Sequence, residues 1–177
     1  MNIEKRRYIN YFKALAVAFG LILFDQCTKL MAVEQLKGKT PFVIIDGVFQ
    51  LEYLENRGAA FGIFQGRQIF FIASALLISA VVVWFFLKVP MEPRFFPLQA
   101  CAVLIFSGAW GNCIDRLSQG YVVDFFYFIL IHFPIFNVAD IYVTVSAFLL
   151  VVLLFFYYKE EDLERIFHHR KSGRREG

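Results

Sequence analysis

Residues 68–88 read QIFFIASALLISAVVVWFFLK, and no charged side chain interrupts this stretch before Lys88. An α-helix needs about 20 residues to cross a hydrocarbon core of roughly 30 Å, so this stretch is long and apolar enough to span a bilayer. Three further segments qualify in the same way, at about 13–33, 97–114 and 138–158. The sequence therefore predicts an all-α integral membrane protein with four transmembrane helices.

The composition supports a membrane protein. The 177 residues are 59% hydrophobic, which is more apolar surface than a soluble domain of this length can bury. The net charge is only +3, and the basic residues gather toward the two ends of the chain rather than on one face. This distribution argues against a nucleic-acid-binding protein.

The sequence predicts no metal or other cofactor. Cys27, Cys101 and Cys113 stand in apolar stretches without CxxC or Cys/His spacing, so they indicate neither a zinc site nor a disulfide framework. The pair His168-His169 has no third ligand nearby in the sequence. We therefore interpret the cysteines as small buried hydrophobic residues.

The positions of the basic residues predict the orientation. Those at the two ends and in the turn at 88–97 fall on one side of the four predicted spans: Lys5, Arg6, Arg7, Lys13, Lys88, Arg94 and most of the tail. By the positive-inside rule that side is the cytoplasm, so both termini are cytoplasmic and segments 34–67 and 115–137 lie outside. The first apolar run has no small-x-small cleavage site after it, so we expect a retained helix.

The chain is expected to form one membrane domain, residues 1–158, followed by a charged cytoplasmic tail, residues 159–177. The tail can extend the last helix by a turn or two, since Glu161 and Arg165 have i,i+4 spacing. In the first outer segment, β-prone residues flank Asp46-Gly47, which is a strong hairpin signal. We expect a small β element at about 40–55, on the outer (periplasmic) face. The segment 115–137 is interpreted as an aromatic-rich connection.

Several polar residues lie where lipid disfavours them, and each has two interpretations. Asp25 and Lys29 lie four apart on the first helix, either as a self-neutralised ion pair or as part of a site. Residues 107–116 place Asn112, Asp115 and Arg116 after small residues, which also fits a packing motif capped by a salt bridge. Residues 56–62 fit a tight turn as well as a site.

Two further acids are predicted at the same outer interface. Asp124 is flanked by Val122-Val123 and Phe125-Phe126, and Asp140 opens the fourth helix. Apolar surroundings raise the pKa of a carboxyl, and two neighbouring carboxyls tend to share one proton. Such a pair supplies a base for water and an acid for a carbonyl, as in aspartic proteases. The alternative for Asp140 or Asn137 is helix N-capping.

Five short motifs follow one another along the chain: Asp25-Gln26-Cys27-Thr28-Lys29, Asn56-Arg57-Gly58-Ala59-Ala60-Phe61, Gly111-Asn112-Cys113-Ile114-Asp115-Arg116, Val122-Val123-Asp124-Phe125 and Phe136-Asn137-Val138-Ala139-Asp140. Together they resemble the motifs of the bacterial lipoprotein signal peptidases, also called signal peptidase II, and they extend over nearly the whole chain. One departure is Ser107, where the family often has glycine, which is expected to loosen helix packing.

The resemblance implies an aspartic endopeptidase of the bacterial inner membrane. Such an enzyme removes signal peptides from prolipoproteins on the amino side of a cysteine that carries a diacylglyceryl group. It implies a catalytic pair, Asp124 and Asp140, and supporting residues: Asp25, Lys29, Asn56, Gly58, Asn112, Asp115, Arg116, Asn137 and Ala139. Membrane lipids and cyclic peptide antibiotics of the globomycin type are the further expected partners.

Two other classes of function remain open from the residues alone. A carrier or ion-conducting protein would use Asp25, Asp115, Asp124 and Asp140 as a proton or cation relay. A relay needs acids spread through the membrane depth, whereas these acids are predicted near one face. A structural subunit would account for the small residues of the third helix, but it leaves the two isolated acids unexplained.

Overall fold

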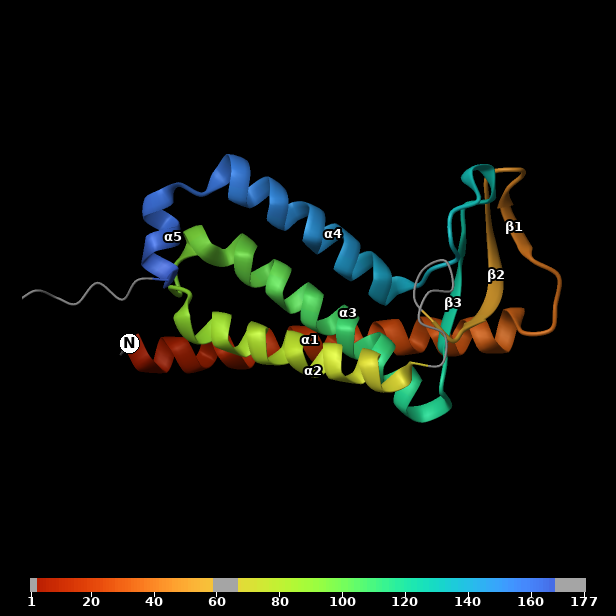
Figure 1. Cartoon of the computed structure of the whole chain (residues 1–177), viewed down its shortest axis with the longest axis horizontal. Coiled ribbons are helices and arrows are strands. Elements are labelled where there is room, and N and C mark those ends of the chain that lie inside the picture. Colours follow the sequence, from red (N-terminus) through yellow and green to blue (C-terminus); the bar gives the residue numbers. More distant parts are fainter. Residues whose placement is uncertain (1–2, 59–66, 168–177) are drawn as a thin grey trace, which may run out of the picture.

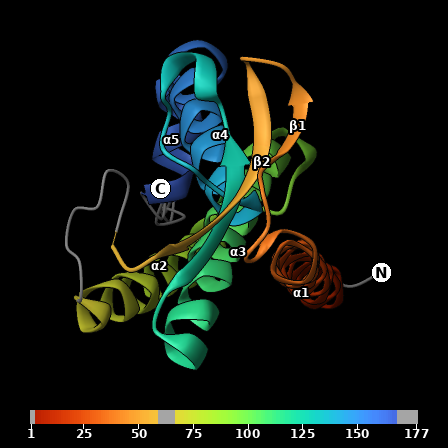
Figure 2. The same cartoon turned by 90° about the vertical axis from the view of Figure 1, so that its right-hand side faces the viewer.

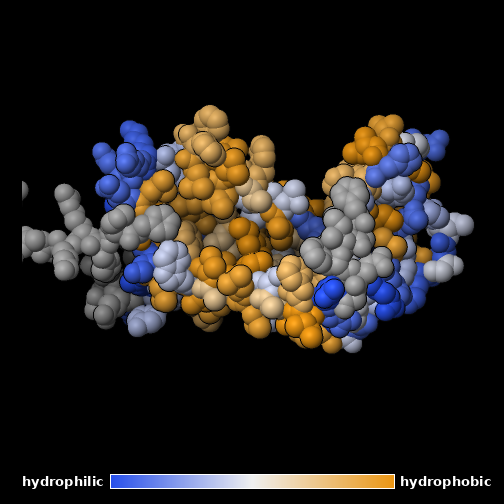
Figure 3. Space-filling model, viewed as in Figure 1, coloured by the Kyte–Doolittle hydropathy of each residue, from blue (hydrophilic) through white to orange (hydrophobic). Residues whose placement is uncertain are grey.

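The computed structural model describes residues 3–58 and 67–167. This part of the chain contains four helices long and apolar enough to cross a membrane: α1 (Ile3–Leu36), α2 (Gln68–Lys88), α3 (Phe96–Gln119) and α4 (Val138–Val152), the last continuing as a π-helical turn, η4 (Leu153–Tyr157) (Figure 1). On the face shown in Figure 3, apolar side chains form a belt over the middle of the bundle, between hydrophilic groups toward its two ends. The predicted four-helix membrane fold is confirmed.

Two helices extend beyond their predicted bounds. α1 begins at Ile3 and ends at Leu36 rather than spanning 13–33, and its 34 residues rise about 51 Å, more than a bilayer core. α3 continues past the predicted end at 114 and stops at Gly120, whose φ of 83° is the left-handed conformation that ends helices. Both predictions counted only apolar residues, whereas the polar ends stay helical because tertiary contacts hold them.

A three-stranded antiparallel sheet lies across one end of the bundle (Figures 1 and 2). The strands are β1 (Phe42–Ile45), β2 (Phe49–Asn56) and β3 (Val122–Tyr127), in that order. The predicted hairpin at Asp46-Gly47 is confirmed, with Gly47 at φ 67°. The interpretation of 115–137 as only a connection is wrong, because β3 pairs with β2. Its residues VVDFFY are β-branched and aromatic, so a strand signal was present.

The sheet rests on the nearby ends of α1 and α4 through a small apolar core. Ala32 and Leu36 of α1 pack with Val123 and Phe125 of β3 and with Val138 of α4. The last turns of α1 therefore leave the apolar belt to support β3, which accounts for the length of α1.

α3 lies at the centre of the bundle and contacts α1, α2 and α4 (Figure 2). Small residues permit these contacts: a Cβ added at Gly108 would lie 2.5 Å from the carbonyl oxygen of Ala139. Ser107, which was expected to loosen the packing, is buried, and its hydroxyl donates to the carbonyl of Val103 at 2.8 Å. The hydroxyl thus has a partner in its own helix.

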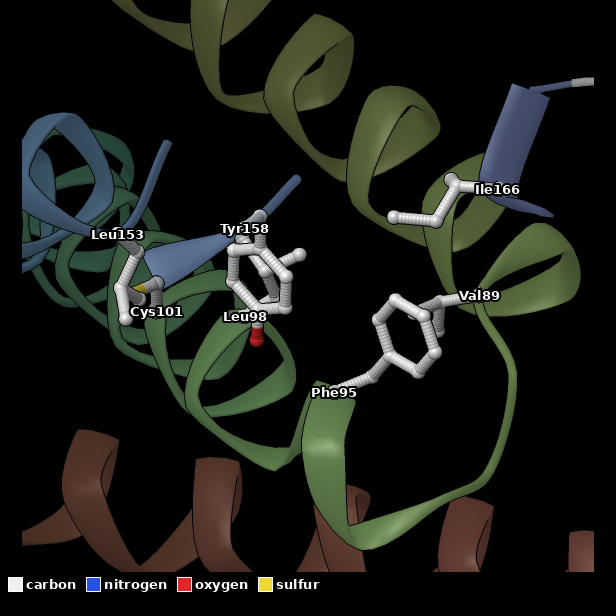
Figure 4. Packing of buried hydrophobic residues seen from close by; sticks show 7 residues of the cluster. All are labelled: Val89, Phe95, Leu98, Cys101, Leu153, Tyr158 and Ile166. Carbon is white, nitrogen blue, oxygen red and sulfur yellow. The ribbon is translucent and has the colours of Figure 1, made fainter. Parts of the chain in front are cut away.

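The opposite end of the bundle is closed by a second apolar core, formed by Val89, Phe95, Leu98, Cys101, Leu153, Tyr158 and Ile166 (Figure 4). Phe95 ends a short 3-10 turn, η2 (Pro93–Phe95), between α2 and α3, and its ring stacks on Tyr158 at 5.8 Å. Cys101 and Cys113 are buried, as predicted, but Cys27 is exposed on α1.

The tail does not extend the last helix as predicted. The backbone is extended at Tyr158, and a separate helix, α5 (Glu160–Phe167), folds back on the turn between α2 and α3. Asp162 accepts two hydrogen bonds from Arg94, at 2.7 and 2.5 Å, and Arg165 pairs with Glu92 rather than with Glu161. The pair His168-His169 lies outside the described residues.

Candidate active site

Asp124 lies at the centre of a polar cluster between the sheet and the helices. The pairing of β3 with β2 brings Asp124 beside Asn56, whose side-chain amide donates to Oδ2 at 2.8 Å. The amide of Asn137 donates to Oδ1 at 2.6 Å. The side chain is buried, and burial raises its pKa to about 7; the charge of Asp140 adds to the rise, while the two amide hydrogen bonds oppose it.

Asp140 occupies the first turn of α4 and has two functions there. Its Oδ2 accepts from the backbone N–H of Asn137 at 3.1 Å, and the Asn137 side chain accepts from the backbone N–H of Asp140 at 3.0 Å. This reciprocal arrangement is a capping box, so the N-capping interpretation is correct for both residues. The other oxygen, Oδ1, accepts from the side-chain amide of Asn112 at 2.7 Å. Capping therefore accounts for only one of the two carboxylate oxygens, Oδ2.

Asn137 joins the two acids into one network. Its amide nitrogen donates both to Asp124 and to Oδ1 of Asn112, at 3.0 Å in the second case. Asn112 in turn donates to Asp140, so each carboxylate has amide donors that belong to one chain of hydrogen bonds. Both acids also line the same groove.

Lys29 of α1 contacts this network through Asn112. Its ammonium is almost fully buried and contacts Oδ2 of Asp25 at 2.9 Å, Oδ2 of Asp115 at 3.0 Å and Oδ1 of Asn112 at 2.9 Å. Because the ammonium occupies the oxygen side of the Asn112 amide, the nitrogen side of that amide faces Asp140. The predicted pair Asp25–Lys29 is confirmed, but Lys29 also contacts Asp115 and Asn112, so the pair is part of a larger network.

The two acids beside Lys29 each fix a different backbone segment. Oδ1 of Asp25 accepts from the N–H of Ala139 at 2.9 Å, and Oδ2 of Asp115 accepts from the N–H of Val123 at 3.1 Å. The first contact positions the start of α4, and the second positions β3 one residue before Asp124. Asp115 thus pairs with Lys29 and positions the strand. The salt bridge that the packing interpretation placed at this motif is therefore formed with a residue of α1.

Arg116 reaches across the groove instead. It donates to the carbonyl oxygen of Gly58 at 2.9 Å, and its guanidinium lies 4.0 Å from the centre of the Phe71 ring. The N–H of Gly58 donates to Oδ1 of Asn56 at 2.9 Å, so the chain turns here as the alternative interpretation predicted. The remainder of that motif, 59–61, lies outside the described residues.

A groove of about 610 Å³ opens beside the two acids, between α2, α3 and α4. Its walls are mainly apolar and include Phe71 and Ile78 of α2, Ala109 of α3 and Val143 of α4. Its charged and side-chain amide groups occur at the end near the sheet, where Asp124 and Asp140 lie. The groove can therefore take an apolar segment and present it to two carboxyls.

One supporting residue was quoted in a motif but given no function from the sequence. Gln26 donates to Oδ1 of Asp115 at 2.9 Å and to the carbonyl of Gly111 at 3.1 Å, which ties α1 to α3. A polar amide within an apolar helix was the available signal. Among the described residues, no group of three or more His, Cys, Asp or Glu side chains could hold a metal ion.

The acids are not spread along the membrane depth as a relay requires. Asp25, Asp115, Asp124 and Asp140 all belong to the cluster at the sheet end, connected through Lys29, Asn112 and Asn137. This grouping favours a single reaction site over a conduction path.

Comparisons with known proteins show the family of this chain. A family profile described as Signal peptidase (SPase) II matches residues 17–156. Proteins named lipoprotein signal peptidase from Clostridium novyi and Clostridium tetani are 43% and 40% identical to this chain, over 78% and 77% of it and 93% and 87% of their own lengths.

Two solved structures share the fold. One, described as a bacterial membrane enzyme determined by the in meso method at 2.3 Å resolution, has a TM-score of 0.71 and 32% identity over 80% of this chain and 87% of its own. Another, at 1.9 Å resolution, has a TM-score of 0.70 and 31% identity over 82% and 94%. Because the family profile matches most of the chain and the relatives and solved structures agree with it in sequence and fold, the chain belongs to the signal peptidase II family.

Proposed function

We propose that this chain is an aspartic endopeptidase that removes signal peptides from bacterial prolipoproteins, cutting on the amino side of the diacylglyceryl-modified cysteine. The observation that carries the proposal is the placement of two carboxyls, Asp124 and Asp140, on one amide network at the polar end of an apolar groove. The names of the relatives from both Clostridium species support the substrate class.

The proposed chemistry divides two tasks between the acids. The ionised carboxyl takes a proton from water, whose oxygen bonds to the carbonyl carbon of the scissile peptide. The protonated carboxyl donates a hydrogen bond to the carbonyl oxygen as negative charge develops there. The C–N bond then breaks, and a proton passes to the leaving nitrogen. A raised pKa at Asp124 supports this division, since it keeps one proton on the pair near neutral pH.

The charge balance of the cluster also supports a shared proton. Four acids, Asp25, Asp115, Asp124 and Asp140, face two cations, Lys29 and Arg116. Lys29 pairs with the first two acids, so the excess negative charge falls on Asp124 and Asp140. Protonating one of them lowers the repulsion at the site where a water and a peptide must bind.

The substrate fits the position of the site. A lipidated cysteine holds its peptide bond at the bilayer surface, and the two acids lie in β3 and in the first turn of α4, at the sheet end of the spans. The groove can receive the signal helix and acyl chains laterally from lipid, while cyclic peptides of the globomycin type would compete for it. We assign the catalytic unit to residues 1–158, both termini to the cytoplasm and the sheet to the outer face of the inner membrane, following the positive-inside rule.

The test is cleavage of a purified precursor by the purified chain in detergent. We expect a lipidated prolipoprotein to be cut so that the mature product begins with the modified cysteine, as read by mass spectrometry. The same precursor with its cysteine left unmodified should be cut far more slowly. A chelator is expected to leave the rate unchanged.

Two results would count against the proposal. If the modified and unmodified precursors are cut at equal rates, the enzyme does not recognise the diacylglyceryl group. Loss of activity in the chelator, restored by a divalent metal, would require ligands other than the carboxyl pair.

A further inference from the structure

A second groove lies at the end of the bundle opposite the sheet. It has a volume of about 730 Å³, and its lining residues come from α1, from α3 and from the end of α2 with the turn that follows it. Figure 1 shows that α1 and α3 diverge toward this end of the bundle. Its walls are mostly apolar and include Ala14 and Val17 of α1, Phe86 of α2, and Phe96 and Val103 of α3. None of these residues belongs to the candidate active site.

Lipid is the medium that this groove meets. Val17 and Phe96 on its two walls are 55% and 68% exposed, and both lie in membrane-spanning helices. An apolar surface at this depth is in contact with acyl chains rather than with water. The groove is therefore suited to hold one or more lipid chains between α1 and α3.

The edge of the groove carries an uncompensated positive charge. Lys13 lines it, and within residues 3–58 and 67–167 this ammonium has no ion pair or hydrogen bond; the same is true of Asn10, one turn away. The acid on the rim, Glu92, is paired with Arg165 at 2.5 Å, so it does not neutralise Lys13. Gln99 is also on the rim, and its amide donates to the carbonyl of Pro90 at 3.2 Å.

The height of Lys13 matches a lipid head group. Lys13 and Asp25 are twelve residues apart on α1, which is roughly 18 Å along the helix axis. Since Asp25 lies in the cluster near the sheet end of a core roughly 30 Å thick, Lys13 lies toward the other interface. Its flexible side chain can then extend to the phosphate level of that leaflet.

From these contacts we propose that the groove between α1 and α3 binds an anionic phospholipid, with its acyl chains along the apolar walls and its phosphate on Lys13 and Asn10. Basic pockets between transmembrane helices are known to bind acidic head groups. This proposal goes beyond the peptidase reaction and does not depend on it. Because α1 and α3 also carry Lys29 and Asn112, a lipid seated here would stabilise the spacing of the two helices that support the active site.

The experiment is native mass spectrometry of the full chain in detergent, with dioleoyl phosphatidylglycerol or dioleoyl phosphatidylcholine added at equal concentrations. One interfacial lysine favours an anionic lipid by roughly fivefold, so we expect the glycerol lipid to form the more abundant complex by about that factor. Lys13→Gln should reduce the preference to near one. Lys88→Gln is the matched control, since Lys88 lies at the same end of the bundle but does not line the groove, and it should keep the preference.

A second variant separates the groove from the surface charge. Val17→Phe places a larger apolar side chain at the groove wall and should reduce the binding of both lipids, with the melting temperature confirming that the variant is folded. The proposal is overturned if wild type binds the two lipids equally, if Lys13→Gln keeps the preference, or if Val17→Phe binds as wild type does. A dimer in place of the lipid complex would also overturn it, because the groove would then be an interface between copies.

Discussion

Asp124 is the residue on which the proposed chemistry depends most. Its surroundings combine burial, the charge of Asp140 and two amide donors, and their sum is a pKa of about 7 against an ordinary 3.8. The sequence predicted the sign of this shift from Val122-Val123 and Phe125-Phe126. The resemblance also named Asn56 and Asn137 among the residues that support the two acids, but only the folded chain shows that each amide donates to a different oxygen of Asp124.

The amide of Asn56 gives a test of this electrostatic account. It hydrogen-bonds the ionised form of Asp124, so Asn56→Ala should raise the pKa of Asp124 above about 7. The pair then keeps its proton to higher pH, and the alkaline limb of kcat/KM should move upward. Gln50→Ala, on the same strand, is the control and should leave the limb in place. If the alkaline limb of kcat/KM does not move in Asn56→Ala, the group that titrates there is not Asp124, and the account is contradicted.

The same pKa shift has a consequence for stability. The folded chain holds a proton on Asp124 that the unfolded chain releases above about pH 3.8. The free energy of unfolding should therefore fall as the pH rises from about 4 through 7. Asp124→Asn removes this titration, so its melting temperature should depend less on pH in that window.

Lys29 is predicted to be the most costly single truncation in the cluster. Lys29→Met leaves Asp25 and Asp115 buried without their cation, and breaking a buried pair in this way costs about 3–5 kcal/mol. Thermal unfolding in detergent measures this loss of stability. Lys37→Met removes the exposed pair with Glu55 and should have little effect. Equal effects of the two substitutions would show that burial of the Lys29 network contributes nothing.

At the scale of elements, the position of α4 depends on contacts with α3 and α1. The start of α4 is fixed by its capping box and by Asp25, which accepts from the N–H of Ala139. A Cβ at Gly111 would lie 2.5 Å from Oδ2 of Asp25, so the small residue there leaves room for this carboxylate. The small residues of the third helix were predicted to permit close packing, and the structure confirms it.

Gly108→Ala tests this close contact. The added Cβ would lie 2.5 Å from the carbonyl oxygen of Ala139 and 2.6 Å from Cγ2 of Val143. Overpacking of this kind costs about 1–3 kcal/mol, and it should also displace Asp140 and lower kcat. Gly20→Ala is the control: a Cβ at Gly20 meets nothing within 4 Å, so this helical substitution should stabilise by about 0.5–1 kcal/mol. A stable, fully active Gly108→Ala protein would contradict the packing argument.

The sequence predicted the spans well and their ends less well. Apolar length alone locates α2 at 68–88, since the side chains of this helix are almost all apolar and only Ala75 among them is buried. It underestimates α1 and α3, whose polar ends are stabilised by partners far away in sequence, such as Lys29 with Asp115. β3 was not predicted as a strand, because its aromatic residues also suit a connection at the membrane interface. Its pairing with β2 decides between the two interpretations.

At the scale of the molecule, the two ends of the bundle are built differently. The sheet end buries charged and amide side chains in one connected network, whereas the opposite end is closed by an apolar core and by α5 (Figures 1 and 4). Arg94 and Asp162 tie α5 to the turn between α2 and α3, and this contact holds the pKa of Asp162 at about 2. That carboxylate therefore stays ionised throughout the neutral range. The grouping of acids at one end was predicted, but the α5 contact was not, because its partners are 68 residues apart.

The central claim is that Asp124 and Asp140 work as a pair, and the most direct measurement is the rate of precursor cleavage by Asp124→Asn and by Asp140→Asn, each tested alone. Asp46→Asn, in the hairpin turn, is the control, because Asn-Gly suits that turn as well as Asp-Gly. Asp124→Asn should stay close to the wild type in stability, because the loss of one of its two accepted hydrogen bonds is offset by the removal of a buried like charge. Asp140→Asn should lose about 0.5–2 kcal/mol with its capping bond. The account predicts that each of the two variants loses about 100-fold to 10,000-fold in kcat while Asp46→Asn keeps the wild-type rate; a wild-type rate in either folded variant would contradict it.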